Sequence, residues 1–472
     1  MATYYSYTPA SLIARAMFNL DATGTANFKL SGLVNVSVSD SFTYQNYLNA
    51  YPSLSPDIYT SLSSGAANWT STQLANINLT TSAYSQFINL IFSTVANYSG
   101  STPADVGRLS DINISLIYRT DWSYAGESAI STDASFGYAY SRGDIVLNIN
   151  GFGGNGLFND YSLDSTSYGF HILMHEFGHS LGLSHPHSSY TNGSSVITAD
   201  YAATTTLGFD KLGFVIASAA DMNKEYFSIM SYDAQRPLSG SDTYAQTPMI
   251  LDVIALQTAY GEGGGTSGSS NDVITAGGGG GITSYRTYFD AGGVDTANLA
   301  NYAAGAYFNM GTTIVGASHL VGVSMSTADA ATMRAGGSPS SLRWFYGEFE
   351  NAIGSAGDDW IVDNALNNLI RGGGGNDTFV CKNGGNDILL GESGSDTLIF
   401  SAARSQYTLA VAASGWCVVA GPNGFEAING VESLQFADQT LSTNTLSTPV
   451  VLGGISVVAA SSLDMSNATT WL

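Results

Sequence analysis

Residues 354–380 read GSAGDDWIV DNALNNLIR GGGGNDTFV, which are three consecutive units of nine residues. Two further units, KNGGNDILL and GESGSDTLI, occupy residues 382–399 after one inserted residue, Cys381. Each unit has a turn, most often rich in glycine, and then Asp or Asn at its sixth position. The eighth position is always apolar: Ile361, Ile370, Phe379, Leu389 and Leu398. A strand of about three residues buries one such side chain, so the stretch is predicted to alternate turn and strand and to wind into a parallel β-roll.

The sixth positions predict where cations bind. Two units make one coil of a roll, so the loops around Asp359, Asp377 and Asp396 are expected to stack in one column. The loops around Asn368 and Asp387 are expected to form the other column. Glycine carbonyls and aspartate carboxylates are hard oxygen ligands, which suit calcium better than zinc or magnesium. The expected calcium ligands of the repeats are Gly354, Gly357, Asp359, Asn368, Gly373, Gly375, Asp377, Gly385, Asp387, Gly394 and Asp396.

Calcium is expected to order this region. Without it, stacked carboxylates repel and glycine-rich turns carry a large entropy cost, so the repeats are predicted to be disordered in the absence of several structural calcium ions. The alternative interpretation is that the units are only solvated Asp-Gly turns.

A second pattern, HEFGHSLGLSH, occupies residues 175–185. His175 and His179 are four residues apart, so on a helix both imidazoles project from one face and can share one tetrahedral ion. Glu176 lies beside them, where a base for a metal-bound water belongs. Gly182 allows the helix to end in a left-handed conformation, so that the chain turns back and His185 reaches the same ion. Three neutral nitrogens and an open fourth position indicate one catalytic zinc ion.

The alternative is a helix that merely carries several histidines. The whole chain has only 6 histidines, which makes this spacing improbable by chance. The neighbouring His171 and His187 are expected to support the site or to lie on the surface, and not to bind zinc.

Composition and charge narrow the classes of partner. The chain has 472 residues, more than one hydrophobic core usually supports, so two or more domains are expected. It carries 37 acidic and 14 basic residues, a net charge of −23, which argues against nucleic acid or an anionic membrane as partner. No apolar run reaches the roughly 18 residues that span a bilayer. Cys381 and Cys417 are interpreted as small buried thiols, although their pairing is left open.

The chain divides at a glycine-rich junction, residues 261–281, which cannot pack a core. Before it, helical spacing in residues 82–95 and strand alternation in residues 112–117 and 145–149 indicate an α+β arrangement. After it, short strands without helical periodicity are expected. The predicted domains are an N-terminal segment at 1–30, a catalytic domain at 31–261, a β-roll at 262–400 and a C-terminal β segment at 401–472.

The zinc segment, together with SIMSY at residues 228–232 and PMILDVIALQTAYG at residues 248–261, resembles the metzincin proteases. Within them the chain is similar to the serralysin family of bacterial proteases, from about residue 30 through DAGGVD at 290–295 to about residue 400. The resemblance implies an α+β metzincin catalytic domain followed by an all-β domain, a parallel β-roll with flanking β-sandwich strands.

The same resemblance implies roles for single residues. Met230 is expected to form an apolar floor beneath the zinc, and Tyr232 to ligate the metal or to hydrogen-bond the reacting carbonyl oxygen. Asp290 and Asp295 are expected to bind calcium. Residues 137–140 and 143–148 resemble the strand above the cleft, where an extended peptide substrate adds as another strand.

The function expected from these features is that of a secreted zinc endopeptidase of broad specificity, which hydrolyses peptide bonds by a zinc-activated water with Glu176 as general base. The N-terminus has no basic residue before Arg15 and does not have the pattern of a cleaved signal peptide. The resemblance therefore implies export by a type I secretion apparatus through a signal near the C-terminus, with a short propeptide within residues 1–30. Protein or peptide substrates and a monomeric enzyme are expected.

Two alternatives stay open. One is a calcium-dependent cell-surface or adhesive protein with a vestigial protease domain, against which the intact zinc pattern argues. The other is a protease dedicated to one surface-protein partner.

Overall fold

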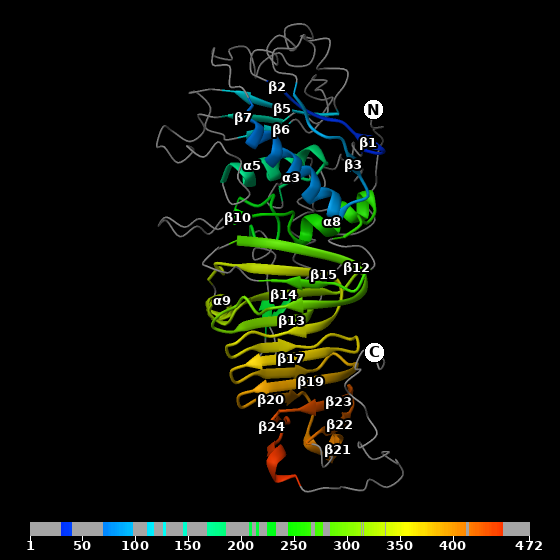
Figure 1. Ribbon diagram of the computed structural model, residues 1–472, viewed down its shortest axis with the longest axis vertical. Coiled ribbons are helices and arrows are strands. Elements are labelled where there is room, and N and C mark those ends of the chain that lie inside the picture. Colours follow the sequence, from blue (N-terminus) through cyan, green and yellow to red (C-terminus); the bar gives the residue numbers. More distant parts are fainter. Residues whose placement is uncertain are drawn as a thin grey trace, which may run out of the picture. The chain divides into compact units, whose positions relative to one another are not determined.

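The structure is a computed structural model, and its chain forms two compact units (Figure 1). Unit 1 comprises residues 1–205, 218–265 and 284–287, and unit 2 comprises residues 206–217, 266–283 and 288–472. The structure describes residues 30–39, 69–97, 111–117, 126–128, 145–148, 168–185, 207–209, 214–216, 224–232, 244–265, 270–276, 284–312, 314, 316–335, 337–411 and 415–446.

Unit 1 contains three described helices, α3 (Ser71–Phe87), α5 (Tyr168–Ser180) and α8 (Ile250–Tyr260). The last of these lies within residues 248–261, one of the segments that resemble the metzincins. Helix α3 differs from the expected helical stretch at 82–95. It begins earlier because Thr70 and Gln73 form a capping box, and it ends at Phe87, after which the backbone is extended.

The described strands of unit 1 form one main sheet in the order β4-β2-β5-β7-β6. Its members are β4 (Ala96–Asn97), β2 (Val36–Ser39), β5 (Ile112–Ile117), β7 (Ile145–Asn148) and β6 (Gly126–Ser128). All neighbours are parallel except β6, which pairs antiparallel with β7. The predicted strands at 112–117 and 145–149 are therefore confirmed. A further parallel pair joins β1 (Leu33–Val34) to β3 (Ile91–Phe92).

Three short strands lie outside these sheets. β8 (Leu207–Phe209) and β9 (Phe214–Ile216) form an antiparallel pair. β10 (Tyr244–Ala245) pairs with the first residues of β12 (Ser284–Asn298).

Unit 2 is built on strands, as expected, with one described α-helix that the sequence did not predict. This helix, α9 (Thr327–Arg334), begins where the Ser326 hydroxyl accepts a hydrogen bond from the Asp329 N–H. The strands before and around it are β11 (Val273–Thr275), β13 (Ala306–Thr312), β14 (Val321–Ser326) and β15 (Leu342–Ile353). β14 pairs antiparallel with both β13 and β15, and these antiparallel strands precede the nine-residue units.

The nine-residue units form two parallel ladders, as predicted for a roll. One ladder runs β13-β16-β18-β20-β24 and the other β15-β17-β19-β23, so consecutive strands of the chain alternate between them. Figure 1 shows β17 and β19 as neighbouring rungs. The bounds are β16 (Trp360–Val362), β17 (Leu369–Gly374), β18 (Thr378–Cys381), β19 (Asn386–Ser393), β20 (Thr397–Phe400), β23 (Gly424–Asn429) and β24 (Ser433–Gln435).

Hairpins continue the ladders after the last nine-residue unit. β23 pairs antiparallel with β22 (Cys417–Gly421), which pairs with β21 (Thr408–Val411), and β24 pairs antiparallel with β25 (Thr440–Ser442). Two 3-10 turns, η3 (Arg404–Gln406) and η4 (Thr443–Thr445), flank them.

The core of unit 2 consists of the eighth-position side chains. Ile361, Ile370, Phe379, Leu389 and Leu398 are all buried in one cluster, together with the free thiols Cys381 and Cys417. Each coil thus contributes large apolar groups to a continuous core, which offsets the entropy cost of its glycine turns. None of the described helices has the length and apolar character needed to cross a bilayer.

Candidate functional site

Helix α5 carries the first two histidines of the zinc pattern on one buried face. The helix ends in a Schellman motif, in which Gly182 N–H donates to His179 O at 2.8 Å and Leu183 N–H donates to Gly178 O at 3.0 Å. Gly182 has the positive φ of 98° that this turn requires, as predicted. The reversal brings His185 back to the helix.

The three imidazoles meet at one point. His185 Nε2 lies 3.1 Å from His175 Nε2 and 3.0 Å from His179 Nε2. The ligand nitrogens of a tetrahedral zinc site are about 3.3 Å apart when each is about 2.0–2.1 Å from the metal. The sequence spacing therefore predicted a real cluster.

The other ring nitrogens explain why this cluster suits a cation. His175 Nδ1 is 2.8 Å from Ile229 O, and His179 Nδ1 is 2.7 Å from Leu183 O. A carbonyl only accepts, so each Nδ1 must carry the proton, and each neutral ring then presents an Nε2 lone pair. Both lone pairs lie close to His185 Nε2, so the three nitrogens can bind one cation when His185 is also neutral and carries its proton on Nδ1. Burial, followed by His175 and His185, lowers the pKa of His179 well below its ordinary value, which keeps that ring neutral.

Met230 packs against the helix that carries the histidines. A Cβ at Gly178 would lie 2.8 Å from Met230 Sδ and 3.1 Å from the Tyr84 hydroxyl, so only glycine leaves room for both. Met230 is fully buried, as the resemblance implied. The need for glycine at 178 was not recognised from the sequence, although a glycine inside a helix was a visible signal.

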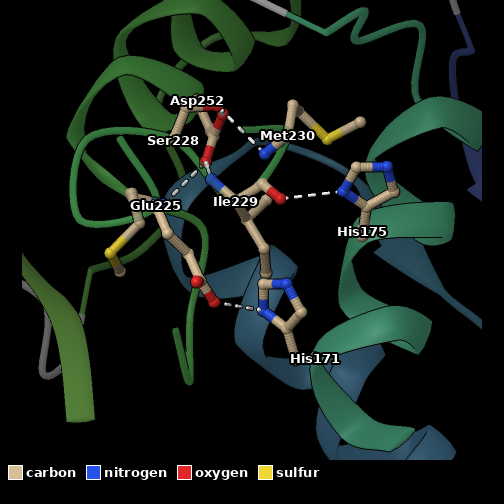
Figure 2. Close-up of polar contacts among 8 residues, drawn as sticks. His171, His175, Glu225, Ser228, Ile229, Met230 and Asp252 are labelled. Carbon is tan, nitrogen blue, oxygen red and sulfur yellow. Dashed lines mark hydrogen bonds and ion pairs between the residues drawn. The ribbon is translucent and has the colours of Figure 1, made fainter. Parts of the chain in front are cut away.

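Asp252 holds the turn that contains Met230 (Figure 2). Its carboxylate accepts hydrogen bonds from Ser228 Oγ at 2.6 Å, Ile229 N–H at 2.7 Å and Met249 N–H at 2.8 Å. Burial raises the pKa of Asp252 to about 7, against the opposing effect of these three donors. Because Ile229 O also receives His175 Nδ1–H, Asp252 is linked through one residue to a predicted zinc ligand.

A second buried pair supports α5 from the same side. Figure 2 shows His171 pointing to Glu225, with Nδ1 3.1 Å from Oε1. Both side chains are buried, at 5% and 2% exposure. The expectation that His171 supports the site instead of binding the metal agrees with this contact. Glu225 and Asp252 were missed because neither lies near the histidines in sequence.

Tyr232 lies at the open side of the histidine cluster. Its ring centroid is 4.3 Å from that of His185 and 5.5 Å from that of His175, and 66% of the residue is exposed. Glu176, by contrast, is buried on α5 at 6% exposure. The two proposed catalytic side chains thus differ in solvent exposure, since Tyr232 is exposed and Glu176 is buried.

The strand expected above the cleft is only partly described. Residues 137–140, 143 and 144 lie outside the described residues, as does His187. Ile145–Asn148 form β7, which pairs with β5 on one side and β6 on the other. For residues 145–148 the prediction of an added peptide strand is therefore wrong, because their backbone groups are already paired, whereas for residues 137–140 it stays a prediction. Within the described residues, β6 is the strand at that edge.

The first column of acids in unit 2 is a chain of hydrogen bonds. Each acid's backbone N–H donates to the carboxylate one coil further on: Asp359 to Asp377 Oδ1 at 2.9 Å, Asp377 to Asp396 Oδ1 at 2.8 Å, and Asp396 to Glu432 Oε2 at 2.8 Å. At the other end, Ala306 N–H donates to Asp359 Oδ1. The predicted stacking of Asp359, Asp377 and Asp396 is therefore present.

The second column follows the same pattern. Asn368 N–H donates to Asp387 Oδ1 at 2.9 Å, and the ladder register continues from Asp387 to Glu426. Before the nine-residue units, Asp272 N–H donates to Asp295 Oδ1 at 2.9 Å, and Asp295 N–H to Glu350 Oε2 at 2.7 Å. The second column of acids thus extends beyond the nine-residue units, both before them and after them.

The second oxygens of these carboxylates have a distinct environment. Asp295 Oδ2, Asp377 Oδ2, Asp396 Oδ2 and Glu426 Oε2 are buried without a hydrogen-bond partner. Ideal Cβ atoms built on Gly372 and Gly391 would lie 2.2 Å and 2.3 Å from Asp377 Oδ2 and Asp396 Oδ2. Orphaned anionic oxygens beside glycine backbone fit the hard, oxygen-only coordination of calcium.

The predicted glycine ligands line the same turns. Four of them take a positive φ, namely Gly373 (98°), Gly375 (100°), Gly385 (97°) and Gly394 (143°). Gly354 and Gly357 do not, but a Cβ on either would overlap the backbone of a neighbouring coil. Bulkier residues would therefore disrupt the stack at all six positions.

Burial also raises the pKa values of the column acids. The pKa of Asp377 rises to about 7 and that of Asp387 to about 8, and burial is the main cause in both. Burial also raises the pKa values of Asp359 and Asp396. The folded repeats therefore need protons or cations to balance these carboxylates.

Asp290 and Asp295 lie together with Asp272. One ligand atom from each of the three lies within 4.8 Å of the others, and Asp290 and Asp295 are fully buried. Burial raises the pKa of Asp295 to about 6. The sequence singled out Asp290 and Asp295 and missed Asp272, which lies in the glycine-rich junction.

Glu350, Glu426 and Glu432 were also missed. Each takes the place of an aspartate in a column, followed two residues later by a buried Ala352, Ile428 or Leu434. In the sequence, each of these glutamates lies two residues before an apolar residue. None of them follows the glycine-rich turn that identified the other units.

Comparison with known proteins finds a repeat family and several related proteases. The RTX calcium-binding nonapeptide repeat, in 4 copies, matches residues 353–380 and 383–400. The chain is 28% identical over 218 residues to Metallopeptidase AprA of Pseudomonas marginalis, covering 44% of this chain and 40% of that protein. It is 25% identical over 331 residues to Serralysin B of Dickeya chrysanthemi, covering 67% and 57%.

A third relative is Metalloprotease AprA of Pseudomonas entomophila, 27% identical over 227 residues, with 45% of this chain and 41% of that protein covered. The chain thus matches roughly half the length of these relatives, between 40% and 57%. In sequence it is serralysin-like and carries RTX calcium-binding repeats.

Proposed function

We propose that this serralysin-like chain is a secreted zinc endopeptidase whose RTX repeats fold around calcium. The observation that carries the enzymatic part is the convergence of three Nε2 atoms to 3.0–3.1 Å, with the Nδ1 atoms of His175 and His179 committed to carbonyls. His175, His179 and His185 would hold the zinc. When bound, zinc would polarise the scissile carbonyl and acidify a water molecule.

The chain's own residues supply the remaining chemistry. Glu176, which is buried on α5, accepts the proton of the attacking water and passes it to the leaving amine. The Tyr232 hydroxyl hydrogen-bonds the carbonyl oxygen as negative charge develops there. It can also approach the metal in the resting enzyme. Met230 and Asp252 hold the histidines in place from below.

The second part of the proposal concerns the repeats. Asp290, Asp295, Asp359, Asn368, Asp377, Asp387 and Asp396, with the carbonyls of the turn glycines, would hold several calcium ions. The unpartnered second oxygens of Asp295, Asp377 and Asp396 support this role. The proposed domains are the segment 1–30, the catalytic domain 31–261, the roll 262–400 and the C-terminal segment 401–472.

Secretion follows from the relatives and the repeats. RTX repeats that are disordered without calcium would pass through a type I exporter and fold outside, where calcium is plentiful. Deleting residues 441–472 should keep the protein inside the cell if the export signal lies there. Normal export of the truncated chain would rule out that location.

The decisive experiment is cleavage of an unfolded protein mixture by the full-length chain, with cut sites read by mass spectrometry. The wild type should cut at many sites in zinc and calcium, and a chelator should abolish the cuts. Glu176→Gln is the matched control, since it should keep zinc but lose most activity. Retention of a tenth or more of the rate in Glu176→Gln would refute its role as base.

The same experiment separates the other candidates. A protein with a vestigial protease domain would bind zinc without cutting any substrate. A dedicated protease would leave the mixture intact and cut one surface protein.

A further inference from the structure

A cluster of buried side chains in unit 2 contains a thiol among the acids of the second column. Asp363, Cys381 and Asp387 are each 1% exposed, and one ligand atom from each lies within 4.8 Å of the others. Asp363 follows β16, Cys381 ends β18 and Asp387 lies in β19. Three separate segments of two successive coils therefore converge on one point.

Glu426 adds a fourth acidic group to this cluster. It is the register partner of Asp387 in the neighbouring strand, is 2% exposed, and its Oε2 is buried without a hydrogen-bond partner. After burial itself, Asp363, Glu426 and Asp387 all raise the pKa of the Cys381 thiol. Burial raises the pKa of Glu426 to about 8, and Asp363 adds to that rise. The four groups thus act on one another at short range.

The hydrogen bonds of the cluster orient the acids but leave it strongly anionic. The Asp363 carboxylate accepts from Lys382 N–H at 3.0 Å and from Asn383 Nδ2 at 3.0 Å, and Asp387 Oδ1 accepts from Asn368 N–H. The charge of Lys382 has the smallest effect among the causes that set the Asp363 pKa. A buried Glu426 oxygen without a partner, on a carboxylate that acts electrostatically on the Cys381 thiol, therefore indicates a missing cation.

We propose that Cys381, Asp363, Asp387 and Glu426 form a structural site for a thiophilic divalent cation, zinc, which is separate from the three-histidine cluster and which shares Asp387 with the second column but differs from the all-oxygen calcium loops by its thiolate. A thiolate is a good ligand for zinc and a poor one for calcium. Zinc ligands lie about 3.3–3.8 Å apart, so the ligand atoms of Asp363, Cys381 and Asp387, already within 4.8 Å of one another, need only a small contraction. Binding releases the thiol proton to solvent, and the thiolate and one carboxylate neutralise the two positive charges.

The insertion that interrupts the nine-residue count explains why the site occurs here. Cys381 is that inserted residue, and it extends β18 by one position, where it pairs with Phe400. The extra residue brings a sulfur atom to the place where the chain crosses from the first ladder to the second. Zinc there would link strands from both ladders.

Cys417 provides a matched control. It lies in the same core cluster and is 3% exposed, yet the charged group that acts on it is Arg404 and not the acids. Burial raises its pKa to about 11. A change at Cys417 therefore alters a buried thiol without touching the proposed site.

The test uses cadmium as a spectroscopic substitute for zinc. Full-length chain is unfolded in chelator, refolded in calcium, and titrated with cadmium while the ultraviolet thiolate-to-cadmium charge-transfer band is recorded. The three-histidine cluster has no sulfur and cannot produce this band. The wild type and Cys417→Ser should show one equivalent of thiolate-bound cadmium that zinc displaces, and Cys381→Ser should show none. Glu426→Gln should weaken cadmium binding at least tenfold.

A second measurement, made on the wild type, tests the proposal even if Cys381→Ser does not fold. In the wild type, zinc should protect Cys381 from alkylation at partial denaturation far more than it protects Cys417, as read by mass spectrometry. The proposal is overturned if the wild type shows no charge-transfer band, if the band survives in Cys381→Ser, if calcium displaces cadmium as well as zinc does, or if zinc protects the two thiols equally. None of these outcomes depends on peptidase activity.

Discussion

The backbone N–H of Asp359 donates to the Oδ1 of Asp377, one coil further along the roll, at 2.9 Å. The same carboxylate keeps its Oδ2 buried without a partner. One oxygen of each such acid therefore holds the stack together, while the other is available to a cation. A substitution can therefore remove the charge that binds a cation and still keep the hydrogen bond between coils.

Asp377→Asn should keep the hydrogen bond from Asp359 and lose the charge that holds calcium. We expect the melting temperature of the repeats at saturating calcium to fall, while circular dichroism in chelator should show repeats no less ordered than those of the wild type, because a repelling charge is gone. Asp438→Asn, an exposed acid outside the columns, is the control and should change neither value. An unshifted calcium-bound melting temperature in Asp377→Asn would show that this carboxylate does not bind calcium.

Protons should partly replace calcium in the repeats. The pKa of Asp377 is raised to about 7 and that of Asp387 to about 8, against about 4 in an unfolded chain. Between these values the folded state binds more protons than the unfolded state, so the stability that the two protonated groups contribute is complete below about pH 4 and is lost as pH rises to about 8. Circular dichroism in chelator should therefore show more ordered repeats at pH 5 than at pH 8. The gain in order on adding calcium should be smaller at pH 5, and the reverse order would contradict the burial of these acids.

Tyr232→Phe should reduce turnover more than substrate affinity. The hydroxyl is useful chiefly when charge builds on the carbonyl oxygen, and one such donor is worth about 3 kcal/mol, or about 10²-fold in rate. Steady-state kinetics on a fluorogenic peptide would separate kcat from KM. An unchanged kcat would assign oxyanion stabilisation to another group.

Asp252→Asn should disturb zinc binding from a distance. Ile229 N–H and Met249 N–H both donate to Oδ2, so the amide oxygen can keep these two bonds only as a weaker, uncharged acceptor, while the amide nitrogen faces Ser228 Oγ and the hydroxyl loses its acceptor, at a cost of about 1–3 kcal/mol. Since Ile229 O orients His175, we expect a lower zinc affinity by dialysis and metal analysis, as well as a lower melting temperature. Ser228→Ala leaves both N–H bonds to Asp252 in place but unpairs Met230 N–H, which donates to Ser228 Oγ at 3.0 Å, so it should lower the melting temperature and change zinc affinity less. Equal zinc affinities in wild type and Asp252→Asn would limit Asp252 to a role in stability.

Gly178→Ala should strain the floor of the site. The new Cβ would lie 2.8 Å from Met230 Sδ, and overpacking of this kind costs about 1–3 kcal/mol. The matched control is Gly264→Ala, where a Cβ meets nothing within 4 Å. A thermal melt of both variants would measure the difference, and equal melting temperatures would mean that Met230 moves freely.

The sequence alone determined two features of this protein, the histidine cluster and the repeats. The zinc histidines fall within eleven residues on one helix and its following turn, so helical geometry and one glycine bring them together with little help from the rest of the chain. The repeats likewise have a period of nine, and each unit contains its own turn, acid and core residue. Local chemistry was sufficient to predict both ladders and both columns.

Other features depended on the tertiary structure. The register of hairpin strands brought Glu426 and Glu432 into the columns, and pairing on both sides of β7 removed it from the sheet edge. Helix packing brought Glu225 to His171, and Asp252 beneath the histidines. Asp363, Cys381 and Asp387 met because one inserted residue shifted a strand end. These contacts join residues whose separation in sequence carries no periodic signal, so only the strand register and the packing of helices decide them.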